Sequence, residues 1–196
     1  LAATAASCGD SSPSGESSLS PGTSGSPSGS TRYVAPNGAD TNAGTKQAPW
    51  ATIGAALEKA AAGETILVAD GRYETAIRTE RAATADAPIT VQAASGARPV
   101  IRPTGEDAVI AVGGQAAHLI FDGLTFEGAT GESSANIYIA GAASDITFRH
   151  CVSRGSARQG FFSERTTARV RIDSCSFANN GGSGPDNQDH NLYVEG

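Results

Sequence analysis

The chain of 196 residues contains no methionine, only two lysines (Lys46 and Lys59) and one tryptophan, and aromatic residues make up only 6% of it. The net charge is −6 and the arginines are scattered, so there is no basic stripe of the kind that neutralises nucleic-acid phosphates. We therefore expect no nucleic-acid partner. No apolar run reaches the roughly 20 residues that a membrane-spanning helix needs, so any membrane attachment would come through a lipid.

The two ends of the chain suggest a piece of a longer protein. Without a methionine, Leu1 is not a translated start, and residues 191–196 stop inside an apolar alternation. Residues 1–8 indicate the remnant of a signal peptide that ends in a lipobox, with Cys8 as the lipidated residue. The alternative is an ordinary secretory cleavage region with an incidental cysteine. Both interpretations predict an extracytoplasmic protein, either secreted or a cell-envelope lipoprotein.

Residues 9–31 predict a disordered tether. They are almost entirely Ser, Gly, Pro and Thr, and Leu19 is their single large apolar residue. Such a segment buries too little apolar surface to offset the entropy of ordering it. The domain is therefore expected over residues 32–196.

An N-terminal cap is predicted over residues 32–73. A short strand and a Pro-Asn-Gly turn precede a helix, which Thr52 caps and Gly63 ends. Its apolar residues have helical i, i+3, i+4, i+7 spacing, at Ile53, Ala56, Leu57 and Ala60. Residues 65–68 then predict a buried strand.

Three segments of this cap, 33–40 (YVAPNGAD), 48–53 (APWATI) and 63–73 (GETILVADGRY), resemble the entry segment of the pectate-lyase-like superfamily of right-handed β-helices. The resemblance covers about a fifth of the chain and is specific for fold rather than for reaction. It implies that the helix covers the open end of a coil, whose unpaired strand edges would otherwise invite aggregation.

From residue 85 onwards the sequence repeats. Segments 118–126, 145–153 and 169–177 align with offsets of 27 and 24 residues, which is the length of one rung of a three-strand solenoid. The fold class is therefore predicted to be all-β, a right-handed parallel β-helix with rungs over 85–196. A β-sandwich is the competing fold, but it does not predict this recurrence. The predicted inward columns are Leu119/Ile146/Val170, Phe121/Phe148/Ile172, Leu124/Cys151/Cys175 and Ile110/Ile137/Phe161/Leu192.

Two further columns have structural interpretations. Cys151 and Cys175 are expected to stack as buried thiols, although their predicted separation also permits a disulfide. Asp122, Arg149 and Asp173 alternate in charge on the outside. They favour an ionic staple between rungs over a binding subsite for a polyanion.

A candidate glycan-binding face lies on the strands predicted near residues 136–139, 160–163 and 191–194. Tyr138, Phe162 and Tyr193 stack outward there as a possible platform for sugar rings, and Glu164 and Glu195 follow them. Two such carboxylates can serve a retaining glycosidase or hold calcium together. The alternative is that the aromatic side chains pack beneath a loop.

The insertion 178–190 lengthens one rung to 31 residues, counted from Phe161 to Leu192, and is predicted beside the same face. Asp186 and Asp189 are candidate calcium ligands, and His190 can assist proton transfer. The alternative is that these residues simply form turns.

The superfamily resemblance implies a polysaccharide lyase, in which calcium neutralises a uronate carboxylate and a basic side chain removes the adjacent proton. No lysine lies in the rungs, so Arg165 and His190 are the nearest substitutes for that base, and Glu164 and Glu195 are the other catalytic candidates. The aspartate pair and Gly-His-Gly signature of the related polygalacturonases are absent.

We therefore predict a monomeric, envelope-tethered protein that acts on an acidic polysaccharide, as a uronate-polysaccharide (pectate-like) lyase or related depolymerase with its catalytic rungs beyond Gly196. Its net acidity favours calcium as a bridge to such a substrate. The alternative is a non-catalytic surface module for glycan binding or adhesion.

Overall fold

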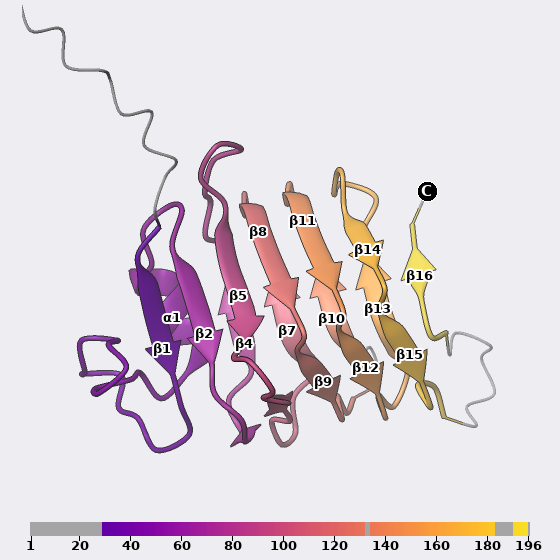
Figure 1. The fold of residues 1–196 in the computed structure, drawn as a ribbon. Coiled ribbons are helices and arrows are strands. Elements are labelled where there is room, and N and C mark those ends of the chain that lie inside the picture. The colour runs from indigo at the N-terminus through magenta and orange to yellow at the C-terminus, as the bar shows by residue number, and fades with distance from the viewer. Residues whose placement is uncertain (1–28, 132–133, 183–189, 196) are drawn as a thin grey trace, which may run out of the picture.

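The computed structural model describes residues 29–131, 134–182 and 190–195, and in them the chain winds into a right-handed parallel β-solenoid with one short helix. Each turn of the coil contributes one strand to each of three sheets. Figure 1 shows the strands of successive turns side by side in chain order. The predicted fold class is confirmed.

The strands of each sheet pair in parallel with their neighbours. Sheet A contains β1 (Thr31–Val34), β2 (Thr65–Val68), β5 (Ile89–Ala93), β8 (Ala117–Asp122), β11 (Ser144–Arg149) and β14 (Arg171–Asp173). Sheet B contains β3 (Arg72–Tyr73), β6 (Val100–Ile101), β9 (Thr125–Glu127), β12 (Val152–Arg154) and β15 (Ser176–Ala178). Sheet C contains β4 (Ile77–Thr79), β7 (Ala108–Val112), β10 (Ala135–Ile139), β13 (Gln159–Ser163) and β16 (Tyr193–Val194).

The core is a set of inward columns in the predicted register. Phe148 pairs with Phe121 on one side and Ile172 on the other, and Ile146 pairs with Leu119. The Phe121 and Phe148 rings stack with centroids 5.0 Å apart. Burial decreases at the last turn, where Ile172 is only partly buried and Leu192 is 44% exposed, because no described rung packs over it.

Cys151 and Cys175 are free thiols, as the stacked-thiol interpretation predicts. The backbone N–H of Cys151 lies 3.4 Å from Cys175 Sγ. This contact places the two residues one above the other inside neighbouring rungs.

The cap contains the predicted helix, α1 (Ile53–Lys59). Thr52 is its N-cap and its hydroxyl accepts a hydrogen bond from Ala55 N–H at 3.2 Å. The prediction that Gly63 ends the helix is wrong. Ala60 already has an extended conformation (φ −63°, ψ 137°) as the C-cap, and Gly63 N–H instead donates to Ala87 O.

Trp50 anchors the cap. Its side chain is buried, and its indole N–H donates to Asn42 O at 2.8 Å. Nearby, the Asp40 carboxylate accepts hydrogen bonds from Thr52 and Ala51. Burial opposes ionisation, but these hydrogen bonds hold the pKa of Asp40 below its ordinary value. The cap is thus fixed by contacts within residues 40–55.

Two boundaries in the structure differ from the predicted ones. The first strand begins at Thr31, within the predicted tether, because Thr31 pairs with Thr65 and the Ser30 hydroxyl donates to Glu64. The remaining tether and the lipobox fall in residues 1–28, outside the described residues. The rungs also start before residue 85, because β2, β3 and β4 (residues 65–79) already pair with β5, β6 and β7.

Left-handed backbone conformations recur at equivalent bends of successive rungs. One column is Gly123/His150/Ser174, a second is Gly128/Gly155/Asn179 and a third is His118/Asp145/Arg169. Positive φ is uncommon outside glycine, and glycine is the residue that adopts it without steric cost. The third column is the one of the three that contains no glycine, so each of its bends displays a side chain.

Candidate functional site

The predicted aromatic column lies on the outer face of sheet C. Tyr138 pairs with Phe162 across β10 and β13, and Phe162 pairs with Tyr193 across β13 and β16. Ile137 and Ile139 are buried on either side of Tyr138, so the alternation turns Tyr138 outward. The structure therefore brings the three residues predicted as a platform into one file.

The rings in this file stack face to face. Centroids are 5.6 Å apart for Tyr138 and Phe162 and 5.5 Å apart for Phe162 and Tyr193, with interplanar angles of 24° and 15°. The His190 ring continues the stack at 5.5 Å and 14° from Tyr193. Nearly parallel rings whose centroids are this far apart are offset, so each ring covers only part of the next.

Glu164 is held by the first ring of the stack. The Tyr138 hydroxyl donates to its Oε1, and Gly141 N–H donates to its Oε2 at 3.0 Å. These two hydrogen bonds lower the pKa of Glu164. The bond between Tyr138 and Glu164 also raises the pKa of Tyr138 to about 12. At neutral pH Glu164 is thus a carboxylate and Tyr138 a phenol, and the pair locks the orientation of the ring.

Glu195 lies at the other end of the stack. With Gln159, Phe162, His190 and Tyr193 it lines a surface hollow of about 210 Å³. Arg165 N–H lies 3.4 Å from Glu195 Oε2. The described candidates His190 and Glu195 therefore meet at one hollow, whereas Arg165 reaches it through its backbone.

The proposed calcium ligands Asp186 and Asp189 lie outside the described residues, as does Cys8. Among the described residues, no three or more His, Cys, Asp or Glu side chains gather to hold a metal ion. Glu164 and Glu195 are thus not part of such a group within the described part of the chain.

One buried polar residue was not predicted. Asn136 is fully buried beside the turn that follows sheet B. Its Oδ1 accepts from Ala129 N–H at 2.9 Å, and its Nδ2 lies within hydrogen-bond distance of Ser153 Oγ, Arg154 O and Asn180 Oδ1. Since unpaired buried amides are costly, these bonds indicate that Asn136 fixes the turn before the aromatic column.

The predicted ionic staple is present in part. Asp122 accepts from Arg149 Nε at 2.9 Å and lies 2.9 Å from His150 Nδ1. Asp173 instead forms an ion pair with Arg171 on its own strand, at 3.3 Å. The staple therefore joins β8 to β11, and β14 has a separate pair.

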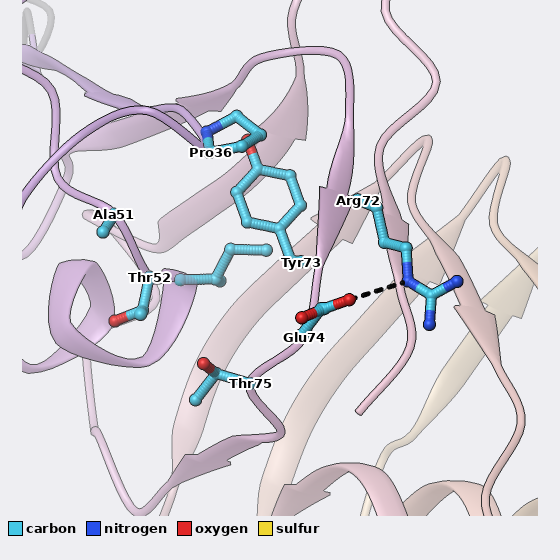
Figure 2. Close-up of a pocket in the computed structure, with 8 residues that line it drawn as sticks. Pro36, Ala51, Thr52, Arg72, Tyr73, Glu74 and Thr75 are labelled. Atoms are coloured by element: carbon cyan, nitrogen blue, oxygen red, sulfur yellow. Dashed lines mark ion pairs between the residues drawn. The ribbon is translucent and has the colours of Figure 1, made fainter. Parts of the chain in front are cut away.

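A second hollow lies in the cap (Figure 2). Its volume is about 260 Å³, and Pro36, Thr52, Tyr73 and Glu74 are among its lining residues. The Tyr73 hydroxyl lies 3.0 Å from Ala69 O, burial raises the pKa of Tyr73, and Glu74 forms an ion pair with Arg72 at 3.4 Å. Because Thr52, Tyr73 and Glu74 already have partners, this hollow offers less for chemistry than the one at His190.

No helix in the described residues is long and apolar enough to cross a membrane. The strands, their parallel register and the outward face of sheet C place the chain among right-handed parallel β-helix proteins.

Comparison with known families makes this placement specific. The model of the Pel9A-like right-handed β-helix region matches residues 32–189, and the chain belongs to this family. Over 63 residues it is 44% identical to the uncharacterized protein YwoF of Bacillus subtilis (strain 168). These 63 residues are 32% of this chain and 14% of that protein.

Two solved structures are similar in fold. Pectate lyase Pel9A matches with a TM-score of 0.58 at 20% identity, over 76% of this chain and 48% of that one. A rhamnogalacturonan lyase matches with a TM-score of 0.59 at 20% identity, over 86% and 51%. The chain thus spans about half the length of these structures and a smaller share of the curated relative.

Proposed function

We propose that the protein acts on polysaccharide through the outer face of sheet C, as a uronate-polysaccharide lyase or related depolymerase. The observation that supports this best is the hollow lined by Phe162, Tyr193, His190 and Glu195, where an imidazole and a carboxylate lie beside aromatic rings. The pectate lyase and the rhamnogalacturonan lyase of similar fold are consistent with a glycan substrate.

The chemistry asked of this face is β-elimination. A base removes the proton beside the uronate carboxylate, the glycosidic C–O bond breaks, the leaving oxygen takes up a proton, and an unsaturated sugar end forms. The His190 imidazole is the side chain that we propose as this base. Calcium, when bound, would neutralise the uronate carboxylate, and we propose Asp186 and Asp189 as its ligands.

A second candidate function is a non-catalytic module that binds glycan. Its supporting observation is that Tyr138 and Glu164 are bonded to each other, which suits a rigid binding surface better than a catalytic pair. In both functions, we propose that the protein is a monomer outside the cytoplasm, tethered by lipid at Cys8.

The test is absorbance of unsaturated products from pectate, rhamnogalacturonan and alginate, measured on the full-length protein with and without chelator. We expect a product signal that chelator suppresses and His190→Ala lowers at least ten-fold, whereas Arg102→Ala, next to β6 on sheet B, leaves it unchanged. Binding to one of these polymers without product would favour the non-catalytic module. Absence of both binding and product would refute both functions.

A further inference from the structure

A groove lies over β8, β11 and β14, on the outer face of sheet A, whereas the aromatic column lies on sheet C. Its volume is about 470 Å³, and Pro88 of the β4–β5 connection forms one wall. Its other lining residues include His118, Asp145 and Arg169 along one edge and Ile120, Thr147 and Arg171 along the floor.

The edge of the groove is the left-handed column without glycine. His118, Asp145 and Arg169 have φ angles of 55°, 56° and 52°, so three successive rungs bend in the same way. Such conformations cost energy for residues other than glycine, and they concentrate at functional positions. The bends point three polar side chains along one line.

The charged side chains of this edge pair mainly with one another. Arg169 donates from Nε and Nη2 to the two oxygens of Asp145, both at 2.6 Å, and His118 Nε2 lies 3.8 Å from Asp145 Oδ2. The hydrogen bonds from Arg169 lower the pKa of Asp145 to about 2, so its carboxylate is ionised and neutralised by the guanidinium.

Arg171 is the cation of the groove that is least engaged. Its side chain is 71% exposed, and its ion pair with Asp173 is long, at 3.3 Å, and exposed on both sides. Exposed pairs of this kind contribute little and exchange partners readily. Arg169 and Asp145 offset each other, so Arg171 is the cation that the groove offers to a ligand, and its partner Asp173 lies outside the lining.

The floor also has an apolar part. Ile120 is only partly buried, and Pro88 lies next to His118 on the edge, because Ile89 pairs with Leu119. A sugar ring has an apolar C–H surface together with hydroxyl groups, and it can pack on such residues while its hydroxyls meet Thr147 and Asp145.

We propose that this groove binds an acidic sugar unit, with the uronate carboxylate on Arg171 and the sugar ring over Ile120 and Pro88. The inference rests on the proposed function in taking a uronate polysaccharide as ligand, but it assigns a second contact on a different sheet. A long chain could then contact the solenoid at two faces.

The test is titration of the full chain with trigalacturonate, followed by calorimetry and by the imidazole signals of His118. We expect Arg171→Gln to weaken binding roughly five-fold, since a charge-assisted hydrogen bond is lost. Arg102→Gln is the matched control, because Arg102 carries the same charge outside the groove and pairs with Glu127 at 2.7 Å. The methyl-esterified trimer should bind more weakly, and Arg171→Gln should not weaken it further.

Several outcomes would overturn the inference: equal affinities of Arg171→Gln and Arg102→Gln, no shift at His118, no binding of the trimer, or acetate binding as tightly as the trimer. If Tyr193→Ala weakens trimer binding while Arg171→Gln does not, the inference fails and the proposed function stands. If Arg171→Gln alone weakens binding and the polymer assay yields neither product nor binding, the proposed function fails instead.

Discussion

The outer faces of sheets A and C are built from the same coil but are stabilised by different interactions. Sheet C stacks the aromatic rings of Tyr138, Phe162 and Tyr193 through three turns. Sheet A joins its turns by ion pairs, Asp122 with Arg149 and Asp145 with Arg169. Because the register is parallel, each strand position recurs in every turn. Side chains of one kind at that position therefore form a column along the face. The same core supports both faces, and the two faces differ in the side chains of their outer columns.

The largest expected effect is on the core that supports both faces. Phe148→Ala removes a fully buried ring that contacts Phe121, Phe126 and Phe161. We expect the free energy of unfolding to fall by about 3–5 kcal/mol, measured by urea denaturation. Phe162→Ala, which removes an outward ring, is the control and should cost less. Equal losses would contradict the inward and outward assignment.

A smaller effect should distinguish the two faces by how the stability loss of a variant depends on salt. Asp122→Ala removes the acceptor shared by Arg149 and His150, and we expect a loss of about 1–2 kcal/mol at low ionic strength. Salt screens ion pairs, so the loss should shrink in 1 M NaCl (the Debye length is then about 3 Å). Phe162→Ala on sheet C should show no such dependence. A salt-independent loss for Asp122→Ala would argue against the staple.

The Tyr138–Glu164 bond adds a pH signature to sheet C. Tyr138→Phe keeps the ring but removes the hydroxyl, for an expected loss of about 1 kcal/mol. The folded pKa of Glu164 is below 4.5, so its contribution is complete above that pH and is lost on acidification through the folded value. The folded pKa of Tyr138 is raised from 10.0 to about 12, so its contribution is complete below pH 10 and is lost as the pH rises through 12.

Melting temperatures of the wild type and Tyr138→Phe from pH 3 to pH 12 check this. The difference should be constant between about pH 5 and pH 10 and should shrink on both sides. A difference that does not change with pH would show that Glu164 is not the acceptor.

The smallest effect is expected at the edge of the sheet A groove. The lowered pKa of Asp145 means that its contribution is present above 3.8 and disappears as the pH falls towards 2. Asp145→Asn should therefore lower the melting temperature slightly at pH 7 and not at pH 2. Asp173→Asn, with its longer ion pair, is the matched control. A larger shift at acidic pH would reverse the assigned sign.

The columns could be predicted from the sequence because a solenoid turns sequence spacing into spatial register. Phe121, Phe148 and Ile172 recur at nearly constant offsets, and the structure pairs them as predicted. The turn formed by residues 65–79 was missed as a rung, because β3 and β4 contain only two and three residues and give little pattern to align. Periodicity therefore identifies rungs whose side chains are alike and misses those that share only the backbone path.

The sequence predicted where the candidate site lies but not how its side chains are oriented. Alternation predicted that Tyr138, Phe162 and Tyr193 stack outward, but it does not specify χ angles, so the nearly parallel orientation of the rings could not be predicted. Strand alternation would also turn Asn136 away from the core, whereas its four hydrogen-bond partners bury it at a turn. Nor does a two-residue period reveal the positive φ of His118, Asp145 and Arg169.

The position of Trp50 provides a built-in probe. As the single tryptophan of the chain, it is buried in the cap and bonded to Asn42, away from every rung beyond the first. In a solenoid each repeat contacts only its neighbours, so the two ends need not unfold together. Tryptophan emission therefore follows melting of the entrance, while far-ultraviolet circular dichroism follows the whole coil. Any divergence between the two signals measures how far cooperativity extends along the axis.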